Sequence, residues 1–122
     1  MKYKEPALLS EREVGAALAS DEYSMAERNE ILVSAIFNAE SVEFAGDLLI
    51  DEFRHRDSEG KLGMFNLFGS FYGVRNEAYR FDDIATLLRE LVADHPSKRA
   101  NIEDEIEYLR EYRDLFAHPD TK

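Results

Sequence analysis

The chain has 122 residues, and 26 Asp and Glu against 15 Lys and Arg give it a formal charge of −11 at pH 7. This length supports one domain with its own hydrophobic core. The absence of cysteine excludes disulfides, thiol nucleophiles and thiolate metal sites. The acidic charge disfavours loose electrostatic binding to nucleic acid or to an anionic membrane. It favours a basic partner, or an RNA site that is small and local.

Targeting signals and cofactor motifs are not recognisable in the sequence. No apolar run approaches the ~20 residues of a membrane span, and no apolar segment typical of a signal peptide follows the first residues. P-loop, G-x-G-x-x-G and H-E-x-x-H patterns are absent. We therefore expect residues 1–122 to form a single cytoplasmic domain without membrane contact, and no cofactor or metal is implied.

Two capping boxes predict helix starts in the N-terminal half. Ser10 and Glu13 form the first box, and Ser24 and Glu27 form the second. From residue 24 to about 54 there is no proline, and apolar or small residues keep a spacing of three and four. We predict one long helix over this segment, roughly 45 Å long. The alternative is a break at residues 40–41, with Ser41 capping a new helix.

The predicted long helix has a second apolar stripe. Phe37, Phe44 and Leu48 lie on the side of the helical wheel opposite the main stripe. A helix with two apolar faces is buried on both sides. We expect the second face to meet the N-terminal helix or another subunit.

The rest of the chain predicts three more helices. Residues 61–72 are apolar nearly all round, as in a buried helix, and Asp82 is expected to cap an amphipathic helix that stops at residues 95–96. The last helix spans about residues 102–116. No stretch alternates with a period of two, so no sheet is predicted. The expected fold is an all-α bundle of about five helices, one of them long and in the N-terminal half.

The last helix carries an arginine in an unusual position. Its expected apolar face comprises Ile102, Ile106, Leu109, Tyr112, Leu115 and Phe116. Arg113 projects onto this face, and an unpaired buried charge costs several kcal/mol. Arg113 should therefore have a carboxylate partner or line a cleft. His118 follows five residues later, and Pro119 disfavours helical geometry there. The chain could fold His118 back toward Arg113, or a second subunit could supply the counterpart.

Residues 108–119 resemble the signature of the HEPN superfamily, the higher eukaryotes and prokaryotes nucleotide-binding domains. Those helical bundles carry an R-x4–6-H motif, often with a polar residue after the arginine and a small residue before the histidine. Here the motif is Arg113-Asp114-Leu115-Phe116-Ala117-His118. The resemblance covers about residues 24–119, and it implies a HEPN-like bundle with an additional N-terminal helix.

The resemblance implies metal-independent RNA cleavage by a homodimer, as in a toxin of a toxin–antitoxin pair. Arg113 would hold the scissile phosphate, and His118 would act as general acid or base. Asp114 would orient one of these two residues. Many relatives are noncatalytic regulators, and in that case Arg113 pairs with a carboxylate and His118 caps the helix. The resemblance is therefore compatible both with an enzyme and with a noncatalytic regulator.

The acidity of the chain motivates a second hypothesis, a non-enzymatic helical protein that binds a basic protein. An immunity protein, an antitoxin or a small regulator would fit, because acidic surfaces steer association with basic partners. Two other patterns are weaker. Glu52-x-x-His55 matches half of a di-iron site, and without a second E-x-x-H it is interpreted as a solvated helix end. Lys98 and Arg99 could contact phosphate, although they are more typical of an ordinary surface.

Overall fold

The computed structural model describes residues 10–20 and 22–117, and this part of the chain contains helices and no strand. The helices are α1 (Glu11–Ala19), α2 (Met25–Asn38), α3 (Val42–His55), α4 (Ser58–Leu62), α5 (Leu67–Arg75), α6 (Phe81–Asp94), the 3-10 helix η2 (Pro96–Lys98) and α7 (Arg99–Ala117). The predicted all-α class is confirmed. None of these helices combines the length and the apolar character that crossing a membrane requires.

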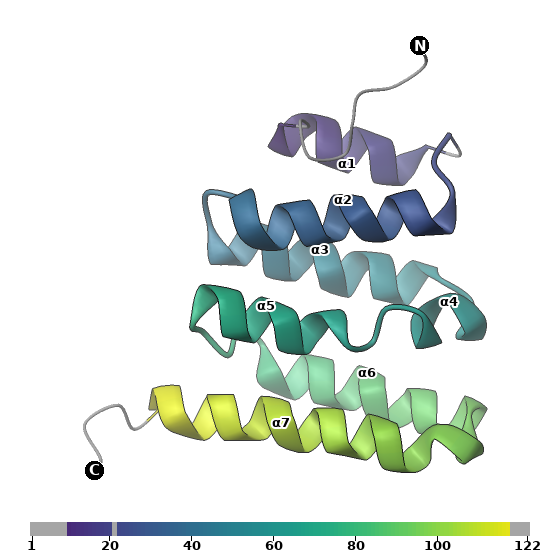
Figure 1. Cartoon of the computed structure of the whole chain (residues 1–122), viewed down its shortest axis with the longest axis vertical. Coiled ribbons are helices and arrows are strands. Elements are labelled where there is room, and N and C mark those ends of the chain that lie inside the picture. The colour runs from purple at the N-terminus through teal and green to yellow at the C-terminus, as the bar shows by residue number, and fades with distance from the viewer. Residues whose placement is uncertain (1–9, 21, 118–122) are drawn as a thin grey trace.

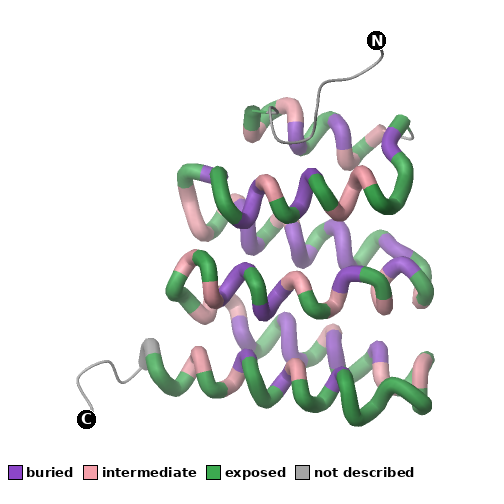
Figure 2. Tube along the Cα trace, viewed as in Figure 1, coloured by how far each residue is buried: buried purple, intermediate pink, exposed green. Residues whose placement is uncertain are grey.

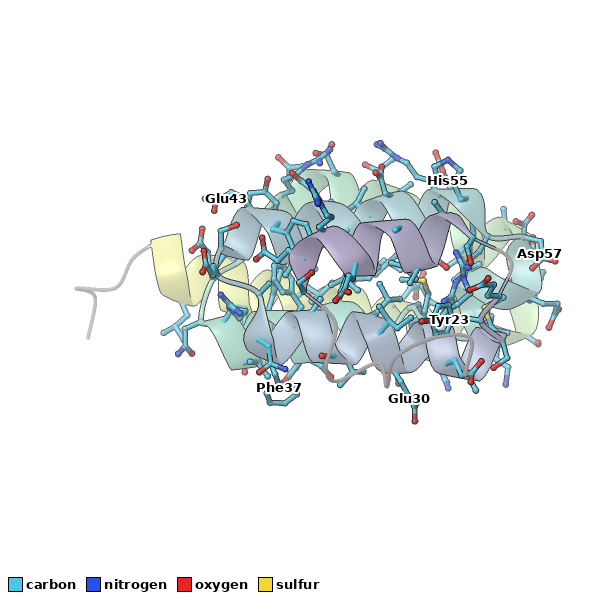
Figure 3. All side chains as sticks on the ribbon, turned by 90° about the horizontal axis from the view of Figure 1, so that it is seen from above. Tyr23, Glu30, Phe37, Glu43, His55 and Asp57 are labelled. Atoms are coloured by element: carbon cyan, nitrogen blue, oxygen red, sulfur yellow. The ribbon has the colours of Figure 1, made fainter. Side chains whose placement is uncertain are left out.

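The helices are stacked in two layers (Figures 1 and 3). α2, α5 and α7 form one layer, and α1, α3 and α6 form the other. α4 is a short helix in contact with α3 and α6. Consecutive helices pack across the layers at α1–α2, α2–α3 and α6–α7, whereas α5 packs within its layer on α2 and α7. α1 and α7 lie at the two ends of the stack (Figure 1).

Buried residues recur along the helices of both layers (Figure 2), and those of α2, α3, α5, α6 and α7 form one hydrophobic core. Its centre is aromatic: the rings of Phe53 and Phe68 meet edge to face with 5.7 Å between centroids. The hydroxyl of Tyr72 donates to the carbonyl oxygen of Tyr79 at 2.9 Å, so the buried phenol is satisfied. A smaller cluster attaches α1 to the stack through Val14, Ala17, Tyr23 and Ile31.

The prediction of one long helix is wrong, and the structure adopts the alternative break. α2 ends at Asn38, Ala39 has an extended backbone, and the Ser41 hydroxyl accepts a hydrogen bond from the Phe44 amide at 3.0 Å at the start of α3. The break lets α3 fold back into the opposite layer, so that both helices bury their apolar stripes in one core. A continuous helix would have left one of these stripes without a neighbour in the same chain.

The predicted number of about five helices is too low because a second predicted helix is also divided. Residues 61–72 contribute to both α4 and α5, and Asp57 caps α4 by accepting from the Gly60 amide at 2.8 Å. Both predicted capping boxes are confirmed at α1 and α2.

The expected cap at Asp82 is wrong, because α6 begins at Phe81, whose side chain is buried in the core. Arg80 precedes Phe81 with a left-handed φ of 52°. Its guanidinium pairs with Asp47 at 3.0 Å and with Asp83 at 2.8 Å. These ion pairs anchor a backbone conformation that a residue with a Cβ adopts at some cost.

Candidate functional site

The predicted motif residues Arg113 and Asp114 lie near the C-terminal end of α7. Ile102, Ile106 and Leu109 of the same helix are buried as predicted. The Arg113 side chain, however, is 42% exposed, and its guanidinium lies over the ring of Phe81, 4.7 Å from the centroid. Phe81 is the first residue of α6, so the apolar face that was expected to be buried along α7 ends at this point.

The carboxylate partner expected for Arg113 is the adjacent Asp114, not a residue inside the bundle. Oδ1 of Asp114 accepts from Nε of Arg113 at 3.0 Å and from Nη2 at 2.8 Å. An exposed ion pair of this kind contributes about 0–1 kcal/mol, so the guanidinium can exchange Asp114 for another anion. His118 lies outside the described residues, and its pairing with Arg113 stays a prediction. Leu115 is 60% exposed, so its assignment to the buried face is wrong.

Glu52 of the E-x-x-H pattern is buried, which corrects its interpretation as part of a solvated helix end. Its carboxylate accepts from Nε and Nη2 of Arg28 at 2.9 Å each, and from Nε of Arg56 at 2.9 Å. His55 is exposed and faces the carbonyl oxygen of Asp51. Within residues 10–20 and 22–117, no cluster of three His, Asp or Glu side chains could hold a metal ion.

The electrostatics of Glu52 indicate a structural role. Burial alone would raise its pKa, but the hydrogen bonds from Arg28 and Arg56 outweigh this effect, and the pKa of Glu52 is lowered. Glu52 is therefore an anion at neutral pH. A general acid or base at that pH would need a pKa much closer to 7.

Exposed apolar side chains define a different candidate site. All six large hydrophobic residues that are exposed in the described part of the chain belong to α2, α5 and α7, the helices of one layer: Met25, Val33, Phe37, Val74, Tyr108 and Leu115. Single exposed apolar residues are normal on soluble proteins, whereas an apolar surface confined to one side of a fold indicates an interaction surface. We define the front face as the outward side of this layer, around Glu30, Val33, Phe37, Ser70, Val74, Asp104, Tyr108 and Glu111. Figure 3 shows Glu30 and Phe37 projecting from α2 away from the opposite layer.

Tyr108 contacts Tyr112 on the front face. Its ring packs edge to face on Tyr112 with 5.2 Å between centroids, and the two hydroxyls are 3.4 Å apart. The Gly69 amide donates to Oε2 of Glu105 at 3.0 Å, which brings α7 close to α5 beside Tyr108. The hydrogen bond to Tyr112, together with partial burial, raises the pKa of Tyr108. Tyr108 is thus a neutral, preorganised aromatic group at physiological pH.

The exposed charges on the front face are mostly negative. Glu30, Asp104 and Glu111 are exposed, and none of them has an ion-pair partner within the described residues. One cation borders the face: Nη1 of Arg75, in the last turn of α5, donates to the carbonyl oxygen of Ile36, next to Phe37, at 3.1 Å. The face therefore combines apolar side chains with an excess of negative charge.

The sequence predicts part of the front face. Phe37 belongs to the second apolar stripe that was expected to meet the N-terminal helix or another subunit. Leu48 of that stripe does pack against the α1 cluster, whereas Phe37 is 61% exposed. The break at residues 39–41 separates the two residues, so only the part of the stripe on α2 stays uncovered. The contributions of Val74 and Tyr108 depend on which helices share a layer, and no local pattern indicates that.

Comparison of the chain with protein-family models, with curated proteins and with solved structures gives no significant match. The chemistry of the front face and of the Arg113–Asp114 pair is therefore the basis for a functional assignment.

Proposed function

We propose that the chain is a non-enzymatic interaction module that binds a basic protein through its front face. The observation that carries this proposal is the confinement of every large exposed hydrophobic side chain in the described part to one layer of the stack. Phe37, which is 61% exposed, and Tyr108, which is 45% exposed, are its aromatic anchors. Aromatic residues are enriched at protein interfaces, and Tyr is among the residues that most often contribute a large share of the binding energy.

The charge of the front face selects the kind of partner. In a symmetric dimer built on this face, Glu30, Asp104 and Glu111 of each copy would approach acidic groups of the other copy. Each copy also carries a formal charge of −11, and like charges across an interface cost free energy. A partner with Lys and Arg around an apolar patch would compensate these charges and bury the aromatic rings.

Affinity purification of the tagged chain from its native cells tests this proposal. The bait is compared with Phe37→Ser on the front face and with Thr86→Ala, an exposed control on α6 in the opposite layer. A basic protein retained by the wild type and by Thr86→Ala, but lost with Phe37→Ser, is then purified for calorimetry. We expect Phe37→Ser to weaken its binding by about tenfold or more, and higher salt to weaken it further.

Three results would overturn the proposal. The first is a basic partner whose affinity is unchanged by Phe37→Ser. The second is that every partner sensitive to Phe37 is acidic. The third is self-association of the wild type that Phe37→Ser abolishes, measured by sedimentation equilibrium, because that result assigns the front face to a second copy of this chain.

We also propose, as a second candidate function, HEPN-like metal-independent cleavage of RNA by a dimer. The observation that favours it is the exposure of the Arg113 guanidinium, whose ion-pair partner within the described residues is the neighbouring Asp114. Arg113 would bind the scissile phosphate, Asp114 would orient Arg113, and His118 would transfer a proton. This activity uses the end of α7 and not the front face.

RNA incubated with the purified chain in EDTA tests the second candidate. We expect cleavage that Arg113→Ala and His118→Ala abolish while the circular dichroism spectrum is unchanged, and that Phe37→Ser leaves intact. Arg54→Ala, an exposed arginine of α3, is the control for net charge. RNA that stays intact with the wild type, or cleavage that persists in His118→Ala, would count against this function without affecting the front-face proposal.

A further inference from the structure

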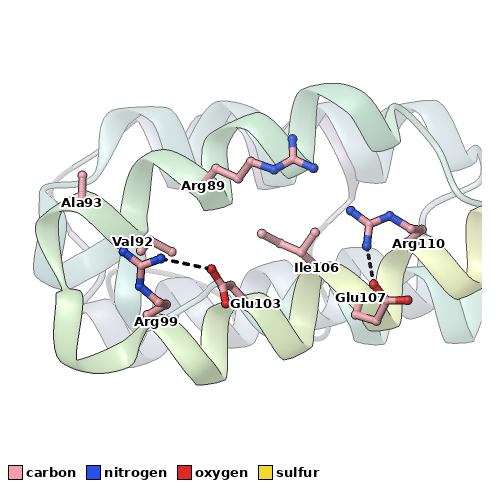
Figure 4. A pocket seen from close by; sticks show the side chains of 8 residues that line it. All are labelled: Arg89, Val92, Ala93, Arg99, Glu103, Ile106, Glu107 and Arg110. Atoms are coloured by element: carbon pink, nitrogen blue, oxygen red, sulfur yellow. Dashed lines mark hydrogen bonds and ion pairs between the residues drawn. The ribbon is translucent and has the colours of Figure 1, made fainter.

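A groove of about 560 Å³ runs along the seam between α6 and α7 (Figure 4). The apolar side chains of Val92 and Ile106 line it from its two helices. Three guanidinium groups also line the groove, those of Arg89, Arg99 and Arg110. Three of the fifteen Lys and Arg residues of an acidic chain therefore gather at one groove.

Two of the three arginines have partners on their own helix, and the third has none. Nη1 of Arg99 is 3.5 Å from Oε2 of Glu103, and Arg110 pairs with Glu107. Arg89 lies on the opposite wall and faces the groove (Figure 4). It has no hydrogen-bond or ion-pair partner within the described residues. The groove therefore has a local charge of +1, in contrast to the rest of the molecule.

The pairs on α7 leave their arginines available to a ligand. The side chains of Arg99 and Glu103 are 65% and 56% exposed, and such surface pairs contribute about 0–1 kcal/mol. An incoming anion can therefore draw Arg99 or Arg110 away from its carboxylate at little cost. The guanidinium groups of Arg89 on α6 and of Arg99 or Arg110 on α7 then donate to the anion from opposite walls of the groove.

This arrangement suits a phosphate better than a carboxylate. A carboxylate has two coplanar oxygens that one guanidinium fork can satisfy, whereas the three terminal oxygens of a phosphomonoester accept from several directions. Its charge of nearly −2 at neutral pH also exceeds that of a carboxylate. The volume of the groove lies within the range of small-molecule sites, and its apolar lining offers contacts that inorganic phosphate cannot use.

We propose that the α6–α7 groove binds a small organic phosphomonoester. Its phosphate is held between Arg89 and Arg110, and its apolar portion rests on Val92 and Ile106. The residues involved belong neither to the front face nor to the Arg113–Asp114 pair, so this site stands apart from both proposed functions.

Titration of the 15N-labelled chain with phenyl phosphate tests the proposal, with inorganic phosphate, benzoate and phenol as comparisons. We expect saturable shifts of the amides of residues 89–93 and 103–110, and tighter binding of phenyl phosphate than of the three other probes. The affinity should fall below about pH 6, where the phosphate loses one charge. Equal affinity for inorganic phosphate would overturn the organic part of the proposal, and an absence of saturable binding would overturn all of it.

Two variants that each remove one positive charge separate a site from a general charge effect. Arg89→Gln is expected to weaken phenyl phosphate binding by about tenfold, since one charge-assisted contact is lost. Arg54→Gln removes an exposed arginine of α3 outside the groove and is expected to leave the affinity unchanged. Equal losses in both variants would contradict the proposal. A single-stranded RNA oligonucleotide that binds more tightly than phenyl phosphate and depends on Arg89 would reassign the groove to a polymer backbone.

Discussion

The carboxylate of Glu52 connects four helices through two arginines. Arg28, in α2, binds it with two nitrogens and also donates to the carbonyl oxygens of Leu18 and Ser20 at the end of α1. Arg56 follows α3, binds the same carboxylate and donates to the carbonyl oxygen of Gly60 in α4. This network adds to the attachment of α1, whose buried side chains Val14 and Ala17 belong to the smaller hydrophobic cluster.

Replacing Glu52 with Gln should therefore destabilise the fold strongly. The Arg56 side chain is 3% exposed, and a buried cation that loses its anion typically costs about 3–5 kcal/mol. Urea unfolding at pH 7, followed by circular dichroism, measures the change in the free energy of unfolding. Asp51→Asn removes the neighbouring carboxylate, which is exposed, and should change stability by less than about 0.5 kcal/mol.

The stability difference between the wild type and Glu52→Gln should depend on pH. The pKa of Glu52 is lowered in the folded state, so its contribution is complete above the unfolded value of about 4.5 and is lost as the pH falls through the folded pKa. The difference in unfolding free energy should accordingly shrink below about pH 4.5. A difference that is as large at pH 3 as at pH 7 would mean that the charge of Glu52 is not what stabilises the network.

At the scale of the helices, two glycines with opposite surroundings test the packing of the stack. A Cβ on Gly46 of α3 would overlap the ring of Tyr79 and would lie 3.1 Å from Cζ of Phe71. Tyr79 cannot move freely, since its hydroxyl donates to Asp47 and its carbonyl oxygen accepts from Tyr72. Gly15 of α1, by contrast, has no atom within 4 Å of the corresponding position.

Gly46→Ala and Gly15→Ala should consequently shift stability in opposite directions. We expect Gly46→Ala to destabilise the protein by about 1–3 kcal/mol through overpacking. Gly15→Ala should stabilise it by about 0.5–1 kcal/mol, because alanine loses less backbone entropy in a helix. Thermal and urea unfolding of both variants measure the two effects. Stabilisation by Gly46→Ala would show that Tyr79 is not held against α3.

The starts of the first two helices could be predicted because their determinants are local. A capping box consists of two residues within one turn, and those at Ser10 and Ser24 are both present in the structure. The break between α2 and α3 was harder to predict, since the spacing of apolar residues continues across it. Ser41 permits a new helix, but only the packing of α3 against α2 makes the break favourable.

The candidate sites depend on contacts between helices, so the sequence predicts them less completely. The wheel placed Arg113 on the buried face of α7, but its exposure is decided by where α6 begins, at Phe81. Arg89 and Arg110 lie on different helices and share no motif. Of the three arginines in the groove, Arg99 alone is indicated by the sequence as a possible phosphate contact.

For the molecule as a whole, the excess of acidic over basic residues is large enough to affect stability. The formal charge is −11, and α7 alone exposes Glu103, Asp104, Glu107, Glu111 and Asp114. Three of these pair with arginines of the same helix, whereas Asp104 and Glu111 have no ion-pair partner within the described residues. Mutual repulsion among them disfavours the compact state, because the unfolded chain holds them further apart.

Added salt should therefore stabilise this protein. Between 20 and 300 mM NaCl we expect the free energy of unfolding to rise by about 1 kcal/mol, since screening weakens the repulsion. Screening also weakens attractive surface pairs such as Arg99–Glu103, but each contributes at most about 1 kcal/mol, and the buried Glu52 network is screened much less. Asp104→Lys reduces the net charge by two and should both stabilise the chain and flatten its salt dependence. Stability that falls with salt would mean that attractive pairs outweigh the repulsion.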